Sequence, residues 1–224
     1  MKNLIILFGA LFLFILGYFI GPIWNQESSA ELWDFVPENP GLVYESNDLG
    51  GTLLRLKDLE SFQSLIRTPS LGKLSDHIAK IERLTGLNSF YSFLDKTSGI
   101  ISLHNTGKNE FDFLYLVAMN DLNTTGVVSK LITPLVSKAI EKQPRAYLGF
   151  ELNEVSLSFT AGRLTYLIYD HYFIASFTPY LVEDAIRTFE DENYKSFRDV
   201  FAEHHQITKI KQDEGNVYLN YKSF

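Results

Sequence analysis

Histidine is the side chain best suited to acid–base or metal chemistry near neutral pH. The five histidines are His77, His104, His171, His204 and His205. None lies in an H-E-x-x-H pattern, and the chain has no cysteine with which a histidine could share a zinc ion. The adjacent His204 and His205 point to different sides of a helix or strand, so they do not form a ligand pair. The sequence therefore predicts no metal site.

Motifs that activate a nucleophile or hold a phosphate are also absent from the sequence. No G-x-S-x-G elbow presents a serine. Gly72-Lys73 is followed by Leu74 where a phosphate loop needs Ser or Thr, and Arg67 stands in place of its first glycine. We expect no catalytic residue and no cofactor-binding residue, and hence no cofactor.

Carboxylates are the remaining candidates for chemistry. They gather in two stretches of the sequence: Glu110 with Asp112, and Glu183, Asp184, Glu190, Asp191 and Glu192. Two acids can act as acid and base when they meet in a cleft whose surroundings separate their pKa values. A hydrolase that uses clustered carboxylates is thus one alternative, whereas solvated helix ends explain the second stretch without any catalysis.

Composition limits the partners. The chain has 224 residues, 20 basic against 27 acidic side chains and a net charge of -7. A protein that follows a phosphate backbone carries a basic surface, so nucleic acid is not an expected partner. Aromatic residues make up 14% of the chain, with 18 Phe and 12 Tyr, which favours a sheet-rich fold.

An apolar run near the amino terminus, residues 3–24, carries no charged side chain. As a helix it is about 33 Å long, enough to cross a roughly 30 Å hydrocarbon layer. A cleaved signal peptide has a shorter apolar core, so an uncleaved signal anchor over residues 1–25 is favoured, with cleavage as the alternative. Without cysteine, attachment to the lipid bilayer depends on the polypeptide itself.

The flanks of this run set its orientation. Lys2 precedes the run, and acidic residues follow it. The positive-inside rule then keeps the amino terminus cytoplasmic and places the rest of the chain outside the inner membrane, in the periplasm or its equivalent. Trp24 and Trp33 are expected at the outer interface of the inner membrane, where an indole can bury its ring and keep its N–H in water.

Glycines in the run suggest a contact with another helix. Gly17 and Gly21 form a G-x-x-x-G pair, and Gly9 lies on about the same helical face. Small residues at this spacing let two membrane helices approach closely. Glycine is also common in membrane helices that have no such partner, so both explanations stay open.

The exported part is expected to be an α+β domain over residues 35–224, joined to the anchor by a polar linker over residues 26–34. Its sheet is predicted to be mainly antiparallel, with amphipathic helices packed on it. Expected strands cover residues 41–47, 99–104, 111–119, 155–159, 164–169, 172–177 and 216–222. Expected helices cover residues 53–66, 74–84, 124–142 with a kink or a break into two short pieces at Pro134, 179–189 and a short stretch from Ser196.

Two segments of the exported part look alike. Residues 99–142 and 155–189 both run strand, turn, strand, helix, and residues 215–221 resemble residues 41–47. A second repeat that starts near residues 215–224 would make Phe224 an unnatural domain end. Short alternating strands also resemble one another by chance, so both explanations remain.

The segment Phe35-Val36-Pro37-Glu38-Asn39-Pro40, which runs into GLVYESND, resembles the start of a family of domains of unknown function. The later segment FIASFTPYLVEDAIRTF is similar to the strand-then-helix element of that family. The resemblance covers about a third of the chain. It implies a membrane-anchored exported bacterial protein and supplies no catalytic residues.

The sequence favours a non-enzymatic interaction module, an accessory subunit of a cell-envelope complex such as one for protein export or assembly. Its expected partners are the bilayer and other membrane or envelope proteins. One alternative is the exported hydrolase, marked by a cleft that gathers acids or histidines. The other is a binder of small apolar ligands or lipid, marked by an apolar cavity between helices and sheet.

Overall fold

The computed structural model describes four stretches of the chain: residues 31–119, 131–157, 162–201 and 215–223. All described residues from Leu32 onward belong to one folded unit, which begins three residues before the predicted domain start at Phe35. The predicted anchor, residues 1–25, lies outside the described residues. Within the four stretches no helix has both the length and the apolarity that crossing a bilayer requires.

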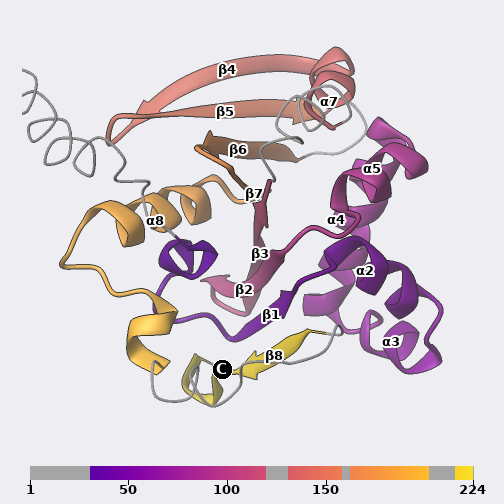
Figure 1. Cartoon of the computed structure of the whole chain (residues 1–224), viewed down its shortest axis with the longest axis horizontal. Coiled ribbons are helices and arrows are strands. Elements are labelled where there is room, and N and C mark those ends of the chain that lie inside the picture. Colours follow the sequence, from indigo (N-terminus) through magenta and orange to yellow (C-terminus); the bar gives the residue numbers. More distant parts are fainter. Residues whose placement is uncertain (1–30, 120–130, 158–161, 202–214, 224) are drawn as a thin grey trace, which may run out of the picture. The chain divides into compact units, whose positions relative to one another are not determined.

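The described strands form one antiparallel sheet with the order β4-β5-β6-β7-β3-β2-β1-β8, which can be followed in Figure 1. The strands are β1 (Leu42–Ser46), β2 (Gly99–Gly107), β3 (Glu110–Ala118), β4 (Ala139–Tyr147), β5 (Phe150–Leu157), β6 (Arg163–Tyr169), β7 (Tyr172–Ser176) and β8 (Asn216–Leu219). The α+β class and the antiparallel sheet are therefore as predicted. Two strands, β4 and β8, form the ends of the sheet.

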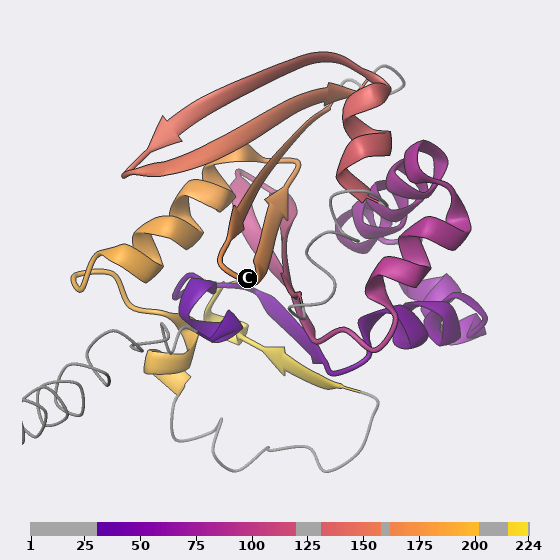
Figure 2. The ribbon, with the colours of Figure 1, turned by 45° about the horizontal axis from the view of Figure 1, so that its top comes forward.

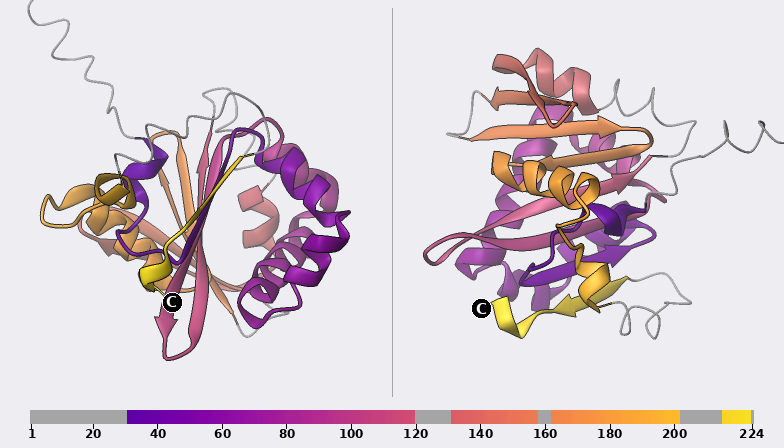
Figure 3. Two further views of the ribbon diagram at one scale, coloured as in Figure 1. Left: turned by 90° about the horizontal axis from the view of Figure 1, so that it is seen from below. Right: turned by 90° about the vertical axis from the view of Figure 1, so that its left-hand side faces the viewer.

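Helices cover both faces of this sheet, as Figure 3 shows from two directions. One layer contains α2 (Leu49–Lys57), α3 (Glu60–Leu65), α4 (Pro69–Thr85), α5 (Leu87–Leu94) and α7 (Thr133–Ser137). The opposite face carries η1 (Leu32–Phe35) and α8 (Pro179–Glu190), which contacts β6, β7 and β3. A further turn, η3 (Tyr221–Ser223), follows β8. Figure 2 shows the β4-β5 hairpin extending between the two helical layers.

Local sequence explains where the helices begin and end. The Asp48 side chain accepts a hydrogen bond from the Gly51 amide at 3.0 Å and so caps α2. Pro69 and Pro179 start α4 and α8, where their missing N–H costs nothing. Gly86 has a φ of 89°, a conformation that stops α4 and allows α5 to start at once.

Several predicted elements are confirmed with small shifts of their ends. The β2-β3 hairpin, the β6-β7 turn at Asp170-His171 and α8 after Thr178-Pro179 all form. The short helix predicted from Ser196 starts at Phe197, with the Asp199 carboxylate accepting hydrogen bonds from the Ser196 amide and hydroxyl. These elements have either a strong alternation or a clear cap in the sequence.

The predicted helix over residues 124–142 is partly right in its described part. Residues 131–132 are π-helical and lead into α7, but α7 ends at Ser137 and β4 starts at Ala139, so the prediction is wrong for residues 139–142. Pro134 lies in the first turn of α7, next to the change from π-helix to α-helix. Residues 120–130 lie outside the described residues. The predicted helix over residues 53–66 is divided into α2 and α3 at Asp58-Leu59, and α5 was not predicted.

Trp33 has a different place from the one expected at the membrane interface. Its indole is only 4% exposed, and Nε1 donates to Glu45 Oε1 at 2.9 Å. Its ring packs against Phe197 and Tyr218, with centroids 6.0 and 5.4 Å apart. The turn of η1 directs this side chain into the domain, so Trp33 is a core residue and its ring is not available to lipid.

Candidate functional site

The outer edge of β8 is the first candidate site. Directly after β8, the Asn220 amide donates to the Gly41 carbonyl at 3.0 Å, and within the strand Leu219 pairs with Leu42. Because the main-chain groups of an antiparallel strand alternate in direction, those of residues 216, 218 and 220 face β1. The main-chain N–H and C=O groups of Val217 and Leu219 therefore point away from the sheet. No described strand pairs with this side.

The side chains of the same two residues are apolar and open to solvent. Val217 is 61% exposed and Leu219 49% exposed. They lie across from Tyr44 and Leu42, which pack against the core on the face that carries α2 to α5. We call the outward main-chain groups and the side chains of Val217 and Leu219 the β8 edge.

The opposite end of the sheet is built differently. The register of β4, β5 and β6 directs the main-chain groups of Lys142, Pro144 and Ala146 outward. Proline has no N–H to offer, and an edge lysine disfavours the docking of another strand. The pairing between Ala139 and Glu141 also contains a bulge. The β4 end thus has three features that block strand addition, and the β8 edge has apolar residues in their place.

Close contacts fix β8 in this position. Gly215 begins the strand with a φ of 98°, and a Cβ there would lie 2.3 Å from the Glu45 carbonyl oxygen, so only glycine fits. The side chain of Tyr218 packs edge-on against Trp33, and its hydroxyl lies 3.4 Å from Glu45. The inner side of β8 is therefore held while the outer side stays open.

A second candidate is a polar groove of about 540 Å³ on the α8 face. It is formed by the loop after η1, the end of β2, one face of α8 and the loop that follows α8. Its lining residues include Glu38, Asn39, His104, Asn105, Tyr180, Asp184, Asn193, Tyr194 and Lys195. We call it the α8 groove. Its volume lies within the range of about 300–1,000 Å³ that small-molecule sites occupy.

His104 lies at the base of the α8 groove and is 4% exposed. Its Nε2 is 2.8 Å from the hydroxyl of Ser102. Among the described residues no hydrogen bond is found for Nδ1 of the ring, which is not one of the fully buried atoms that lack a partner. Burial lowers the pKa of His104 to about 4, because the charged ring would lose its hydration. The imidazole is therefore neutral at physiological pH.

A hydroxyl beside a neutral imidazole is the arrangement of an activated serine. Ser102, however, is fully buried and does not line the α8 groove. Its oxygen has no route to a substrate in this structure. The pair is therefore structural: each polar group satisfies the other inside the domain.

The other buried histidine belongs to a network on the opposite side of the sheet. His77 Nδ1 lies 2.8 Å from the hydroxyl of Tyr115 and 3.7 Å from a carboxylate oxygen of Asp112. Asp112 also accepts hydrogen bonds from the Thr178 hydroxyl and the Phe113 amide. Burial lowers the pKa of His77 to about 4 against the opposing effect of Asp112. These contacts explain why the Asp112 carboxylate is buried without assigning it a catalytic role.

The carboxylates suggested by the sequence do not gather at one point. Glu183 pairs with Arg145 at 2.6 Å, and Asp184 pairs with Arg187. Glu154, which the sequence did not single out, binds both Arg145 and Arg163, at 2.9 and 2.8 Å. These ion pairs hold β4, β5 and β6 to one another and β4 to α8. The carboxylates of Glu110, Glu190 and Glu192 belong to exposed residues.

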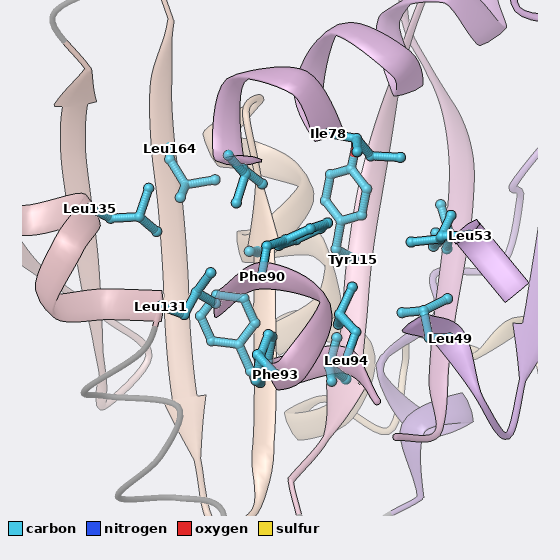
Figure 4. Close-up of a pocket in the computed structure, with 15 residues that line it drawn as sticks. Leu49, Leu53, Ile78, Phe90, Phe93, Leu94, Tyr115, Leu131, Leu135 and Leu164 are labelled. Atoms are coloured by element: carbon cyan, nitrogen blue, oxygen red, sulfur yellow. The ribbon is translucent and has the colours of Figure 1, made fainter. Parts of the chain in front are cut away.

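An apolar cavity lies between the sheet and the first helical layer, as the alternative of an apolar ligand requires. Figure 4 shows leucine, isoleucine and aromatic side chains from α2, α4, α5, α7 and the strands directed toward it. Its volume is about 50 Å³. A dry cavity of about 150 Å³ accommodates benzene, so this one is too small for an acyl chain.

The membrane residues suggested by the sequence, Gly9, Gly17, Gly21 and Trp24, lie outside the described residues. Within the stretches that are described, no three His, Cys, Asp or Glu side chains come together in a way that could hold a metal ion. Comparisons with protein-family models, curated proteins and solved structures found no match to this chain. The function is therefore argued from geometry.

Sequence reasoning singled out neither the β8 edge nor the α8 groove. For the edge, one signal was present: residues 216–222 were predicted as a strand, of which Asn216–Leu219 form β8 while η3 occupies Tyr221–Ser223. The outward direction of Val217 and Leu219 depends on the register with β1, which the sequence does not reveal. For the groove, Asn39, Tyr180 and Tyr194 come from distant segments and carry no shared motif.

Proposed function

We propose that this chain is a non-enzymatic interaction module that binds an extended segment of another envelope protein at the β8 edge. The observation that supports the proposal is the contrast between the two ends of the sheet. The β4 end has Lys142 and Pro144 at outward positions, whereas the β8 edge has Val217 and Leu219. An added strand bonds to outward main-chain groups and packs its alternate side chains on their apolar neighbours.

The N-terminal segment completes this proposal. An anchor over residues 1–25 holds the module at the outer side of the inner membrane, where it meets exported or membrane-embedded chains. Gly17 and Gly21 offer a second contact, between membrane helices, within the same complex. A short edge strand provides limited affinity, and a shared membrane raises the effective concentration of the partner. An accessory subunit of an export or assembly complex fits both features.

The two alternatives have weaker support. The α8 groove brings Glu38, Asp184 and His104 together, as the hydrolase alternative asks, but Asp184 is in an ion pair with Arg187 and His104 is desolvated. The apolar cavity is where the lipid alternative expects it, but its 50 Å³ volume is too small.

Site-specific photo-crosslinking in the native membrane tests the proposal. A photoreactive amino acid replaces Val217 in the full chain, and the matched control replaces Ala146, an outward position of β4. We expect a discrete adduct with another envelope protein from position 217 and none from position 146. Equal yields at both positions contradict the proposal, and a self-adduct from position 217 replaces it with pairing between two copies of the chain.

A further inference from the structure

The α8 groove presents side chains that both donate and accept hydrogen bonds. Asn39, Asn105 and Asn193 each carry an amide, and all three residues are exposed. Asn105 and Asn193 each use part of their amide in local turns, with Gly107 and Asp191. Among the described residues, the side chain of Asn39 has no such bond. A ligand that fits these groups must itself donate and accept.

His104 adds a second polar ring atom to the same groove. Its Nε2 is used by Ser102, and no hydrogen bond is found for its Nδ1 among the described residues. Nδ1 is not one of the fully buried atoms that lack a partner, so it keeps some exposure in the groove that the residue lines. If the Ser102 hydroxyl donates to Nε2, then Nδ1 carries the proton and donates; in the other tautomer Nδ1 accepts. A ligand hydroxyl serves both cases, since it can donate and accept, whereas a carboxylate or an ammonium serves only one.

Two tyrosines provide apolar surface among these polar groups. Tyr180 is 37% exposed, and its hydroxyl lies 3.5 Å from the Asn105 carbonyl, so its side chain extends from α8 toward the end of β2. Tyr194 is 49% exposed, and the Arg187 guanidinium lies 5.8 Å from its ring centre. Aromatic faces of this kind pack against the C–H groups of a sugar ring while neighbouring amides bind its hydroxyls.

Acidic groups outnumber basic groups around the groove. Glu38 and Asp184 are negative, and Lys195 and the Arg187 that pairs with Asp184 are positive. Burial raises the pKa of Tyr180, and the nearby negative charges of Asp112 and Glu110 raise it further. Burial holds His104 neutral, with a pKa of about 4. The groove is therefore unfavourable for an anion, and a neutral ligand suits it better than an acidic one.

We propose that the α8 groove binds a neutral polyhydroxylated ligand, a short segment of an oligosaccharide, with Tyr180 as the ring platform and Asn39 and His104 as hydroxyl partners. This site lies on the α8 face and its residues are not part of the β8 edge. A failure of one proposal therefore leaves the other unaffected.

Titration of the full chain in detergent tests the site. The probes are three neutral tetrasaccharides, maltotetraose, cellotetraose and chitotetraose, with tetragalacturonic acid as a charged comparison. We expect saturable binding of at least one neutral tetrasaccharide below about 10 mM, a concentration that corresponds to weak but specific association. Its addition should shift the imidazole nitrogen signals of His104 in NMR spectra, which locates the ligand at the base of the groove.

Variants separate the groove from the rest of the surface. Tyr180→Ala is expected to weaken binding about tenfold or more, and Asn39→Ala about three- to tenfold, the loss of one hydrogen bond. Both side chains are exposed, so neither change should prevent folding. Tyr221→Ala, the same change at an exposed position outside the groove, should leave binding unaltered. Absence of binding by all three neutral probes, equal binding by Tyr180→Ala, or tighter binding of the charged comparison overturns the proposal.

Discussion

Leu219→Pro is expected to weaken partner binding at the β8 edge and to leave the fold intact. The amide of Leu219 points away from β1, so a proline there removes no hydrogen bond of the sheet. The side chain is 49% exposed, so its loss costs the folded domain little. The change reproduces at one end of the sheet the feature that Pro144 provides at the other.

The expected magnitude follows from the groups removed. An added strand loses one hydrogen bond from the Leu219 N–H, worth about 0.5–1.5 kcal/mol net. It also loses the burial of about half a leucine side chain, roughly 0.7–1.5 kcal/mol. The sum of about 1–3 kcal/mol corresponds to binding that is roughly 5- to 150-fold weaker. Leu219→Ala removes only the apolar part and should show about half of this effect, at most roughly 0.7–1.5 kcal/mol.

The assay is the yield of the adduct formed by a photoreactive residue at position 217, measured with increasing amounts of the chain in the membrane. Ala146→Pro, at an outward position of β4, is the matched control and should leave the yield unchanged. Urea unfolding of each variant shows that the domain still folds. A Leu219→Pro chain that folds normally and gives the full adduct yield refutes the reasoning.

Three further predictions concern the fold. Burial holds the pKa of His77 and His104 near 4, below the ordinary 6.5, so between these pH values the unfolded chain binds more protons than the folded chain. The free energy of unfolding should therefore fall by roughly 3 kcal/mol per histidine as the pH drops from 6.5 to 4. Urea titrations at several pH values measure this fall, and His77→Asn should make it smaller. Trp33→Ala should lower the free energy of unfolding by about 3–5 kcal/mol, since the ring is buried. A loss below about 1 kcal/mol in urea unfolding would mean that Trp33 is part of the linker and not of the core. Val117→Ile adds one methylene beside the apolar cavity and should raise stability by up to about 1 kcal/mol; a lower melting temperature would mean that the space is not available.

The parts of the fold that the sequence predicted are those with a local signal. The β2-β3 hairpin has two apolar strands around a Gly-Lys-Asn turn, and α8 has a proline start and an apolar stripe that includes Leu181 and Ile186. These patterns arise because one side of each element is buried, and burial imposes a period on the sequence. Tertiary contacts were not needed to find them.

The β4 strand shows why the remainder was missed. Most of its residues from Ile140 to Tyr147 are exposed or half-buried, so no alternation of apolar side chains marks it. Its pairing with β5, which follows after the two-residue turn Leu148-Gly149, and the ion pair of Arg145 with Glu154 hold it in place. Neither the turn nor the ion pair produces an apolar pattern that marks the strand in the sequence. Both candidate sites were also missed. The residues that point outward at a sheet edge are set by strand register, and the residues that line a groove are set by packing.

Amide hydrogen exchange at β8 tests the central claim most directly. In the free full chain, the amides of Val217 and Leu219 should exchange rapidly, whereas that of Tyr218, bonded to β1, should be protected. In the complex isolated from its membrane with mild detergent, the account predicts that Val217 and Leu219 become protected while the outward amides of β4 do not change. Unchanged exchange at Val217 and Leu219 in that complex would contradict it.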